Sequence, residues 1–165
     1  MILGILSDTH DHLPLVRTAV RFMNAEAVGL VLHAGDFVSP FVIPELANLS
    51  MPVIGVFGNN DGDRALLLAK CAAAGNVDIR GYFAEIDADG FSVALYHGHE
   101  PALLDALVKS GAFDAVVHGH THEAGSFRAG GTLVVNPGEA CGYLTGQATA
   151  ALLDTDARTA RIVRL

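Results

Sequence analysis

The sequence is poor in basic residues and in cysteine. Ten lysines and arginines oppose 18 aspartates and glutamates, which gives a formal net charge of −8. An acidic surface does not replace the counterions of a phosphate backbone, so we expect no general nucleic-acid binding. The two cysteines, Cys71 and Cys141, match no zinc-binding or redox spacing, and we expect buried thiols in a reducing cytoplasm.

Long hydrophobic runs are also absent. No segment approaches the ~20 apolar residues that cross a bilayer, so we expect no membrane association. The apolar start, residues 1–6, has no basic region and is soon followed by Asp8, which favours a first strand over a signal peptide. With 165 residues, 51% of them hydrophobic, the chain is expected to form one folded domain over residues 1–165.

Short apolar runs alternate with helix-like stretches, which is typical of an α/β domain. The first half predicts strands at 2–6, 30–32 and 53–57, and helices at 13–25, from Ser39-Pro40 onward, and at 64–74. The second half predicts a helix at 102–109, a strand at 115–117, and strand pairs at 82–86 with 91–96, 126–128 with 132–135, and 147–153 with 159–163. This pattern indicates a mixed sheet or two packed sheets rather than a purely parallel sheet.

Side chains that bind metals follow five of the predicted strands. They are Asp8 and His10, Asp36, Asn59 and Asn60, His97 and His99, and His120 and His122. Ligands of open α/β sheets bind at the carboxyl ends of strands, so these side chains are expected to meet in one place. The i, i+2 spacing lets two side chains of an extended segment reach one ion together.

The chemistry of these side chains indicates the kind of ion. Carboxylate, imidazole and amide groups without a thiolate suit manganese, iron, zinc or nickel. Two such ions about 3.5–4 Å apart can share a carboxylate and contact both the attacking and the leaving oxygen of a phosphate ester. Four glycines beside the polar residues would let the backbone turn sharply and approach a ligand: Gly35, Gly58, Gly98 and Gly119.

Five motifs occur in a fixed order along the chain. They are Asp8-x-His10, Gly35-Asp36, Gly58-Asn59-Asn60-Asp61, Tyr96-His97-Gly98-His99 and Gly119-His120-Thr121-His122. Together they resemble the calcineurin-like metallophosphoesterase family, and the short chain is similar to its compact prokaryotic phosphodiesterase branch. The resemblance implies an α/β fold, a sandwich of two mixed β-sheets flanked by helices. It also implies a binuclear metal-dependent phosphodiesterase that attacks a small phosphate ester with a bridging hydroxide.

The resemblance further implies a set of ligands. Asp8, His10 and His122 would hold the first divalent metal ion. Asn59, His97 and His120 would hold the second, and Asp36 would bridge the two. Manganese is the first expectation for both ions, with nickel, iron or zinc as alternatives, and a homo-oligomer is compatible with the sequence.

One departure from the family concerns the leaving group. Many relatives have a histidine where this chain has Asn60, and an amide cannot act as a general acid. We expect Asn60 to donate a hydrogen bond to a phosphate oxygen instead. His99, two residues after His97, is the candidate for the missing acid.

Three further polar residues carry expectations about support. Glu139 stands where relatives often have a serine, and we expect its carboxylate to point away from an anionic substrate. His33 is either a packed, hydrogen-bonded histidine or a support for Asp36. Asp61 is expected to cap the helix that follows it.

Two other functions stay open. The family fold also resembles the small retromer subunit, so a non-catalytic or weakly catalytic metal-binding scaffold for protein–protein contacts is one alternative. The other alternative keeps the chemistry but changes the substrate to a phosphomonoester or a phosphoprotein.

Overall fold

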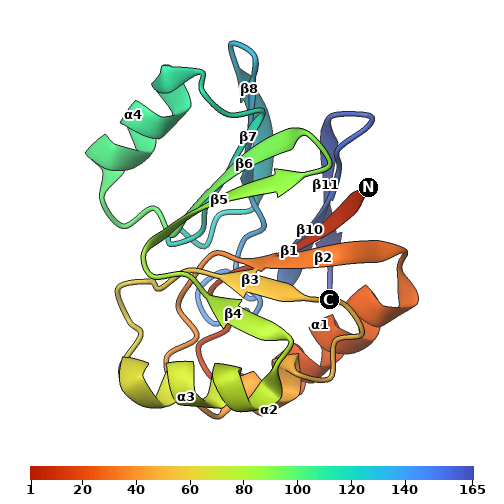
Figure 1. Cartoon of the computed structure of the whole chain (residues 1–165), viewed down its shortest axis with the longest axis vertical. Helices are drawn as coiled ribbons and strands as arrows, with labels where there is room; N and C mark the ends of the chain where they lie inside the picture. Colours follow the sequence, from red (N-terminus) through yellow and green to blue (C-terminus); the bar gives the residue numbers. More distant parts are fainter.

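The computed structural model describes residues 1–165 and consists of two β-sheets packed face to face, with helices outside them (Figure 1). In chain order the elements are β1 (Ile2–Leu6), α1 (Leu13–Ala25), β2 (Val28–His33), α2 (Val42–Leu46), β3 (Val53–Gly55), α3 (Arg64–Ala74), β4 (Val77–Ile79), β5 (Phe83–Ala88), β6 (Phe91–Tyr96), α4 (Pro101–Ser110), β7 (Ala115–Val117), β8 (Gly125–Ala129), β9 (Thr132–Asn136), β10 (Thr149–Asp154) and β11 (Thr159–Arg164).

Both sheets are mixed. The first has the order β11-β10-β1-β2-β3-β4, in which β1 to β4 pair in parallel, while β10 pairs antiparallel with both β1 and β11. The second has the order β5-β6-β7-β9-β8, in which β6, β7 and β9 pair in parallel and the outer strands are antiparallel. The predicted sandwich of two mixed sheets is confirmed.

The apolar residues form two layers because central strands of the first sheet, such as β1 and β3, are buried on both faces. Leu3 and Ile5 of β1 belong to the layer between the sheets, together with Val93 and Leu95 of β6. Leu6 belongs to the second layer, which lies between the first sheet and helices α1, α2 and α3. Helix α4 lies on the side of the second sheet and buries none of its residues (Figure 1).

Helices α1 and α3 have the bounds that the sequence predicts, because their end signals are local. Pro14 lies in the first turn of α1, where a missing N–H costs little. The carboxylate of Asp63 caps α3 by accepting from the amide of Leu66 at 3.0 Å, and Gly75 ends the helix in the left-handed conformation with φ 80°.

Two elements differ from the prediction. Helix α2 begins at Val42 rather than at Ser39-Pro40, because the preceding segment is held in a loop: Val38 has φ 78°, and its amide donates to Asp61 at 2.8 Å. Strand β4 was not predicted, since it has only three residues and pairs with β3 through contacts that no local pattern indicates.

The helices are short. The longest, α1, has 13 residues, and none combines the length and apolar character needed to cross a membrane.

Candidate metal centre

The loops after the parallel strands of both sheets converge at one end of the sandwich. In the first sheet they follow β1, β2 and β3, and in the second they follow β6, β7 and β9. These are carboxyl ends, where α/β sheets bind ligands. All seven predicted metal-binding residues lie on these loops: Asp8, His10, Asp36, Asn59, His97, His120 and His122.

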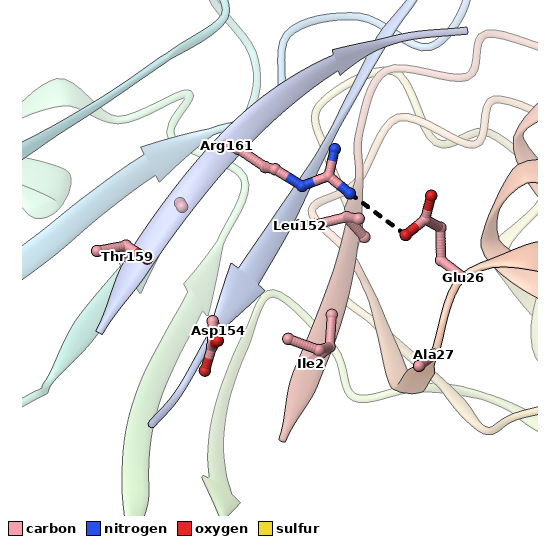
Figure 2. A pocket seen from close by; sticks show the side chains of 8 residues that line it. Ile2, Glu26, Ala27, Leu152, Asp154, Thr159 and Arg161 are labelled. Carbon is pink, nitrogen blue, oxygen red and sulfur yellow. Dashed lines mark hydrogen bonds and ion pairs between the residues drawn. The ribbon is translucent and has the colours of Figure 1, made fainter. Parts of the chain in front are cut away.

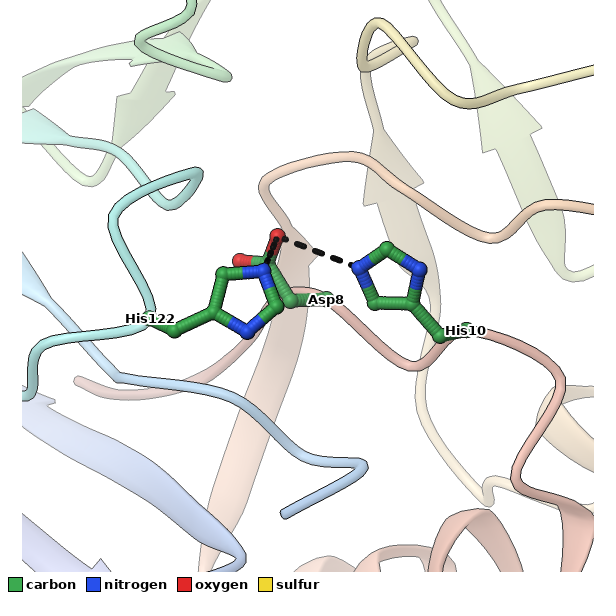
Figure 3. A group of neighbouring side chains, drawn as sticks. All are labelled: Asp8, His10 and His122. Carbon is green, nitrogen blue, oxygen red and sulfur yellow. Dashed lines mark ion pairs between the residues drawn. The ribbon is translucent and has the colours of Figure 1, made fainter. Parts of the chain in front are cut away.

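Asp8, His10 and His122 form the first group of side chains. The Nε2 atoms of His10 and His122 point at the same carboxylate oxygen, Asp8 Oδ1, at 3.7 and 3.3 Å (Figure 3). The ligand atoms of the three residues lie within 4.8 Å of one another. Asp8 is fully buried and His122 is nearly so, while His10 is partly exposed.

Asp36, His97 and Asn59 form the second group. His97 Nε2 lies 3.4 Å from Asp36 Oδ2 and 3.0 Å from Asn59 Oδ1. His10 Nε2 also lies 3.5 Å from Asp36 Oδ2. Asp36 is therefore the residue that touches both groups, which is the position expected of a bridging carboxylate.

His120 lies beside both groups. Its ring centroid is 5.2 Å from that of His97, and its backbone amide donates to Asp8 Oδ2 at 3.1 Å. Burial lowers the pKa of His120, so the imidazole is neutral near pH 7 and has a free lone pair for an ion.

Two buried polar atoms at the centre have no hydrogen-bond partner: Asp8 Oδ1 and His10 Nε2. Such atoms are costly when nothing satisfies them. A divalent cation would satisfy both, and the set of carboxylate, imidazole and amide donors suits such a cation. The residues present thus fit the metal ions that the family resemblance implies.

The backbone at the centre is also unusual. Five of the candidate ligands have a positive φ: Asp8 (53°), His10 (41°), Asp36 (58°), His120 (69°) and His122 (62°). Non-glycine residues adopt this region at a cost of about 1–3 kcal/mol each, and they do so mostly at functional sites. The rest of the fold therefore holds these side chains in place against local preference.

The charge state of Asp36 suits a metal ligand. Burial alone would raise its pKa, but His97 and two hydrogen bonds from Asn60 outweigh burial and hold the pKa well below its usual range. Burial likewise disfavours the charged form of His97, yet the adjacent Asp36 carboxylate raises the pKa of His97. Asp36 is thus a carboxylate at any pH near neutrality.

Asn60 and His99 have different surroundings. The side-chain amide of Asn60 donates to Asp36 Oδ2 at 2.7 Å, so it is engaged with the candidate bridging residue. His99 is half-buried, and its Nδ1 atom has no hydrogen-bond partner. Its ring lies 5.7 Å from His97 and 6.4 Å from His120, centroid to centroid, which places His99 at the edge of the cluster.

Asp61 does not cap α3, and that prediction was wrong. Asp63 is the cap, and the buried carboxylate of Asp61 instead accepts from the amides of Asp36, Val38 and Gly58 at 3.2, 2.8 and 2.7 Å. Asp61 therefore joins the loop after β3 to the loop after β2.

Glu139 lies behind His122, on the side away from Asp8. Its Oε2 atom is 2.6 Å from His122 Nδ1, so His122 presents Nε2 to Asp8. The same carboxylate accepts from the backbone amides of Leu144 and Thr145. Glu139 is fully buried with its carboxylate directed at His122 Nδ1, a contact that sequence reasoning did not identify, and its orientation away from a substrate stays a prediction.

His33 is both packed and supporting. Its ring stacks on Phe37, and its Nδ1 atom accepts from the amide of Gly35 at 3.2 Å. Nε2 must then carry the proton and donate to the hydroxyl of Thr9 at 3.2 Å, which donates in turn to the carbonyl oxygen of Asp36 at 3.3 Å. Burial lowers the pKa of His33 to about 3, so this ring stays neutral.

A separate hollow of about 270 Å³ lies at the opposite end of β1 (Figure 2). Ile2 and Leu152 line its floor, and an ion pair between Arg161 and Glu26, with 3.2 Å between Nη2 and Oε2, lies at its side. Because Ile2 begins β1 and the metal-type side chains follow its end, this hollow is not part of the candidate metal centre.

Comparison with known proteins agrees with the fold and the motifs. Residues 1–158 match the calcineurin-like phosphoesterase superfamily domain. A phosphodiesterase of Methanocaldococcus jannaschii is 44% identical over 165 residues, which cover 100% of this chain and 99% of the relative. The solved structure of an archaeal phosphodiesterase superimposes with a TM-score of 0.95 at 43% identity, over the full length of both chains.

A more distant structure shares the fold alone. The zinc complex of Vps29 from Entamoeba histolytica has a TM-score of 0.72 at 20% identity, and the match covers 100% of this chain and 98% of that one. The family match and the 44% identical relative decide the class: this chain belongs to the calcineurin-like phosphoesterase superfamily. The predicted family is confirmed, and with it a phosphoesterase whose Asp and His cluster can bind metal.

Proposed function

We propose that this protein hydrolyses small phosphodiesters with two divalent metal ions held at the candidate metal centre. The observation that carries the proposal is the gathering of seven ligand-type side chains at one end of the sandwich, where His10 and His97 both lie against Asp36 and two buried polar atoms, Asp8 Oδ1 and His10 Nε2, have no hydrogen-bond partner. The 44% identical relative is a phosphodiesterase, which supports the diester over the monoester.

In this proposal Asp8, His10 and His122 would hold one ion, Asn59, His97 and His120 would hold the other, and Asp36 would be a ligand of both. When bound, the ions withdraw charge from the phosphate and lower the pKa of water. We propose manganese as the physiological ion, with nickel, iron or zinc as alternatives, and the cytoplasm as the location.

The chain's own residues orient these ligands. The carbonyl oxygen of Ala34 lies 2.7 Å from His97 Nδ1, so the Nδ1 proton is held there and Nε2 faces Asn59 and Asp36. Glu139 does the same for His122. Such oxygen partners fix the tautomer and the direction of a metal-binding histidine.

The leaving group needs a proton donor, and His99 is the proposed one. Its ring lies at the edge of the cluster, and its Nδ1 atom has no hydrogen-bond partner. Asn60 is proposed to affect the reaction indirectly, by positioning the Asp36 carboxylate, because its side-chain amide donates a hydrogen bond to that carboxylate.

The test is hydrolysis of bis(p-nitrophenyl) phosphate and of p-nitrophenyl phosphate by protein that is first treated with chelator and then reloaded with manganese. We expect turnover of the diester that disappears with chelator and returns with metal. Faster turnover of the monoester would favour a phosphomonoesterase. No turnover by protein that holds two metals would favour a scaffold.

A further inference from the structure

An apolar cavity of about 460 Å³ lies between helix α4 and the second sheet. Leu104 and Val108 of α4 form one wall, and Phe127 of β8 and Val134 of β9 form the opposite one. The volume is within the range of about 300–1,000 Å³ that is usual for small-molecule sites.

The cavity is continuous with the candidate metal centre. His120, a proposed metal ligand, lines it, and so do Gly98 and Thr121, which lie next to the ligands His97 and His120. A phosphate group bound at the candidate metal centre would therefore lie next to the cavity.

The lining offers little to a charged group. Two charged residues of the lining, Asp105 and Lys109, pair with each other at 2.6 Å, and two histidines, His118 and His120, also line the cavity. The apolar part of the wall is formed by Leu104, Val108, Phe127, Ala129 and Val134, so a neutral apolar group is the matching occupant.

Helix α4 has apolar surface that the fold itself does not cover. None of its ten residues is buried, and Phe127 across the cavity has 60% of its surface exposed. A large contiguous patch of exposed apolar surface often marks a binding site.

We propose that this cavity binds an apolar, ring-bearing ester group of the phosphodiester substrate, and that Leu104, Val108 and Phe127 select for it. The inference rests on the proposed function, because the metal centre must hold the phosphate for the ring to reach the cavity. Burial of the ring would exclude water from both walls of the cavity.

The test uses phosphonates, which bind like phosphate esters but are not hydrolysed. Titration calorimetry of the manganese-loaded protein compares methylphosphonate with phenylphosphonate, which adds only an apolar ring. We expect phenylphosphonate to bind about tenfold more tightly, because the ring leaves water. Leu104→Asn should remove this preference and leave methylphosphonate binding unchanged.

Leu103→Asn is the matched control, because Leu103 is the neighbouring leucine of α4 and does not line the cavity. It should keep the preference for the ring. Phe127→Ala is the second test variant, since its exposed side chain contributes little to folding. Equal binding of the two phosphonates by the wild type, or equal effects of the two leucine variants, would overturn the inference.

Two further outcomes are distinguishable. If Leu104→Asn weakens methylphosphonate as strongly as phenylphosphonate, the side chain acts on the metal centre and the cavity assignment is wrong. If sedimentation shows a wild-type dimer that Leu104→Asn dissociates, a second copy of the chain occupies the cavity instead. Failure of the proposed function has another signature: phosphonates bind with the ring preference, but bis(p-nitrophenyl) phosphate is not turned over.

Discussion

The histidines at the metal centre depend on the oxygen atoms that lie behind their rings. His97 has a carbonyl oxygen there, whereas His122 has the carboxylate of Glu139 at 2.6 Å. A carboxylate partner makes an imidazole more basic and fixes its direction. The buried charge of Glu139 therefore serves to orient one ligand, His122. Burial would raise the pKa of Glu139, but hydrogen bonds from Thr145, His122 and Leu144 lower it to about 2.

Glu139→Gln tests this support. The variant keeps the size of the side chain but loses the charge facing His122. We expect metal affinity to fall about 10- to 100-fold, with activity recovering at saturating metal. The measurement is metal binding by competition with a chromophoric chelator.

The control for Glu139→Gln is Glu123→Gln. Glu123 carries the same charge, is adjacent to His122 in the chain, and is exposed. It should bind metal like the wild type. If both variants bind metal equally well, the hydrogen bond from His122 to Glu139 has no role in the ligand's affinity.

At the scale of residues, the sequence predicted the candidate metal ligands better than the residues that hydrogen-bond to them and hold their loops. His97, His120 and His122 follow strands and recur in motifs, so pattern and resemblance single them out. Two of the three backbone amides that donate to Asp61, those of Asp36 and Val38, are more than 20 positions away. A contact of that kind leaves no local pattern, which is why Asp61 was predicted to cap a helix.

Among the elements, the loops after the strands pack so closely that side chains of one touch the backbone of another. Gly58, after β3, shows this most clearly. A Cβ atom there would lie 2.6 Å from the backbone nitrogen of Asp36 and closer still to its carboxylate. The expectation that Gly35, Gly58, Gly98 and Gly119 allow sharp turns or close approach is confirmed, since Gly35 and Gly98 both have φ 101°.

Gly58→Ala should displace Asp36, because the new methyl group meets backbone that cannot move freely. Small displacements of catalytic groups lower rates by about 100-fold, so we expect a loss of activity of at least that size together with weaker metal binding. Gly131→Ala is the control, since nothing lies within 4 Å of its Cβ position in the turn between β8 and β9. Equal activities of the two variants would contradict this packing.

Elements with local signals were predicted well. The strands that flank Asp89-Gly90 pair antiparallel as β5 and β6, and α3 has the predicted bounds. Local patterns could not predict the strand order, because β10, near the end of the sequence, pairs with β1 at its start. The resemblance to the family supplied the sandwich that the local signals left open.

For the molecule as a whole, buried histidine makes stability depend on pH. His33 is fully buried, and its pKa of about 3 in the folded state lies below the ordinary value of 6.5. As the pH falls below 6.5, the unfolded chain takes up this proton first, so the folded state loses stability progressively down to pH 3. This contribution amounts to about 3 kcal/mol at pH 4.5.

His33→Gln should remove this contribution. Urea unfolding of the chelator-treated protein at pH 7 and pH 4.5 should show a smaller loss of unfolding free energy for the variant, by about 3 kcal/mol. His12→Gln, a change at a half-buried histidine of the α1 cap, should retain the wild-type loss. A wild-type slope in His33→Gln would mean that other groups set the acid sensitivity.

The central claim is that two metal ions share Asp36, and one paired measurement tests it directly. Elemental analysis of bound manganese and turnover of bis(p-nitrophenyl) phosphate are determined for the wild type and for Asp36→Asn. The account predicts two ions per chain in the wild type, fewer in the variant, and a loss of turnover of about 1,000-fold or more with the fold intact. A variant that still holds two ions and still hydrolyses the diester would contradict it.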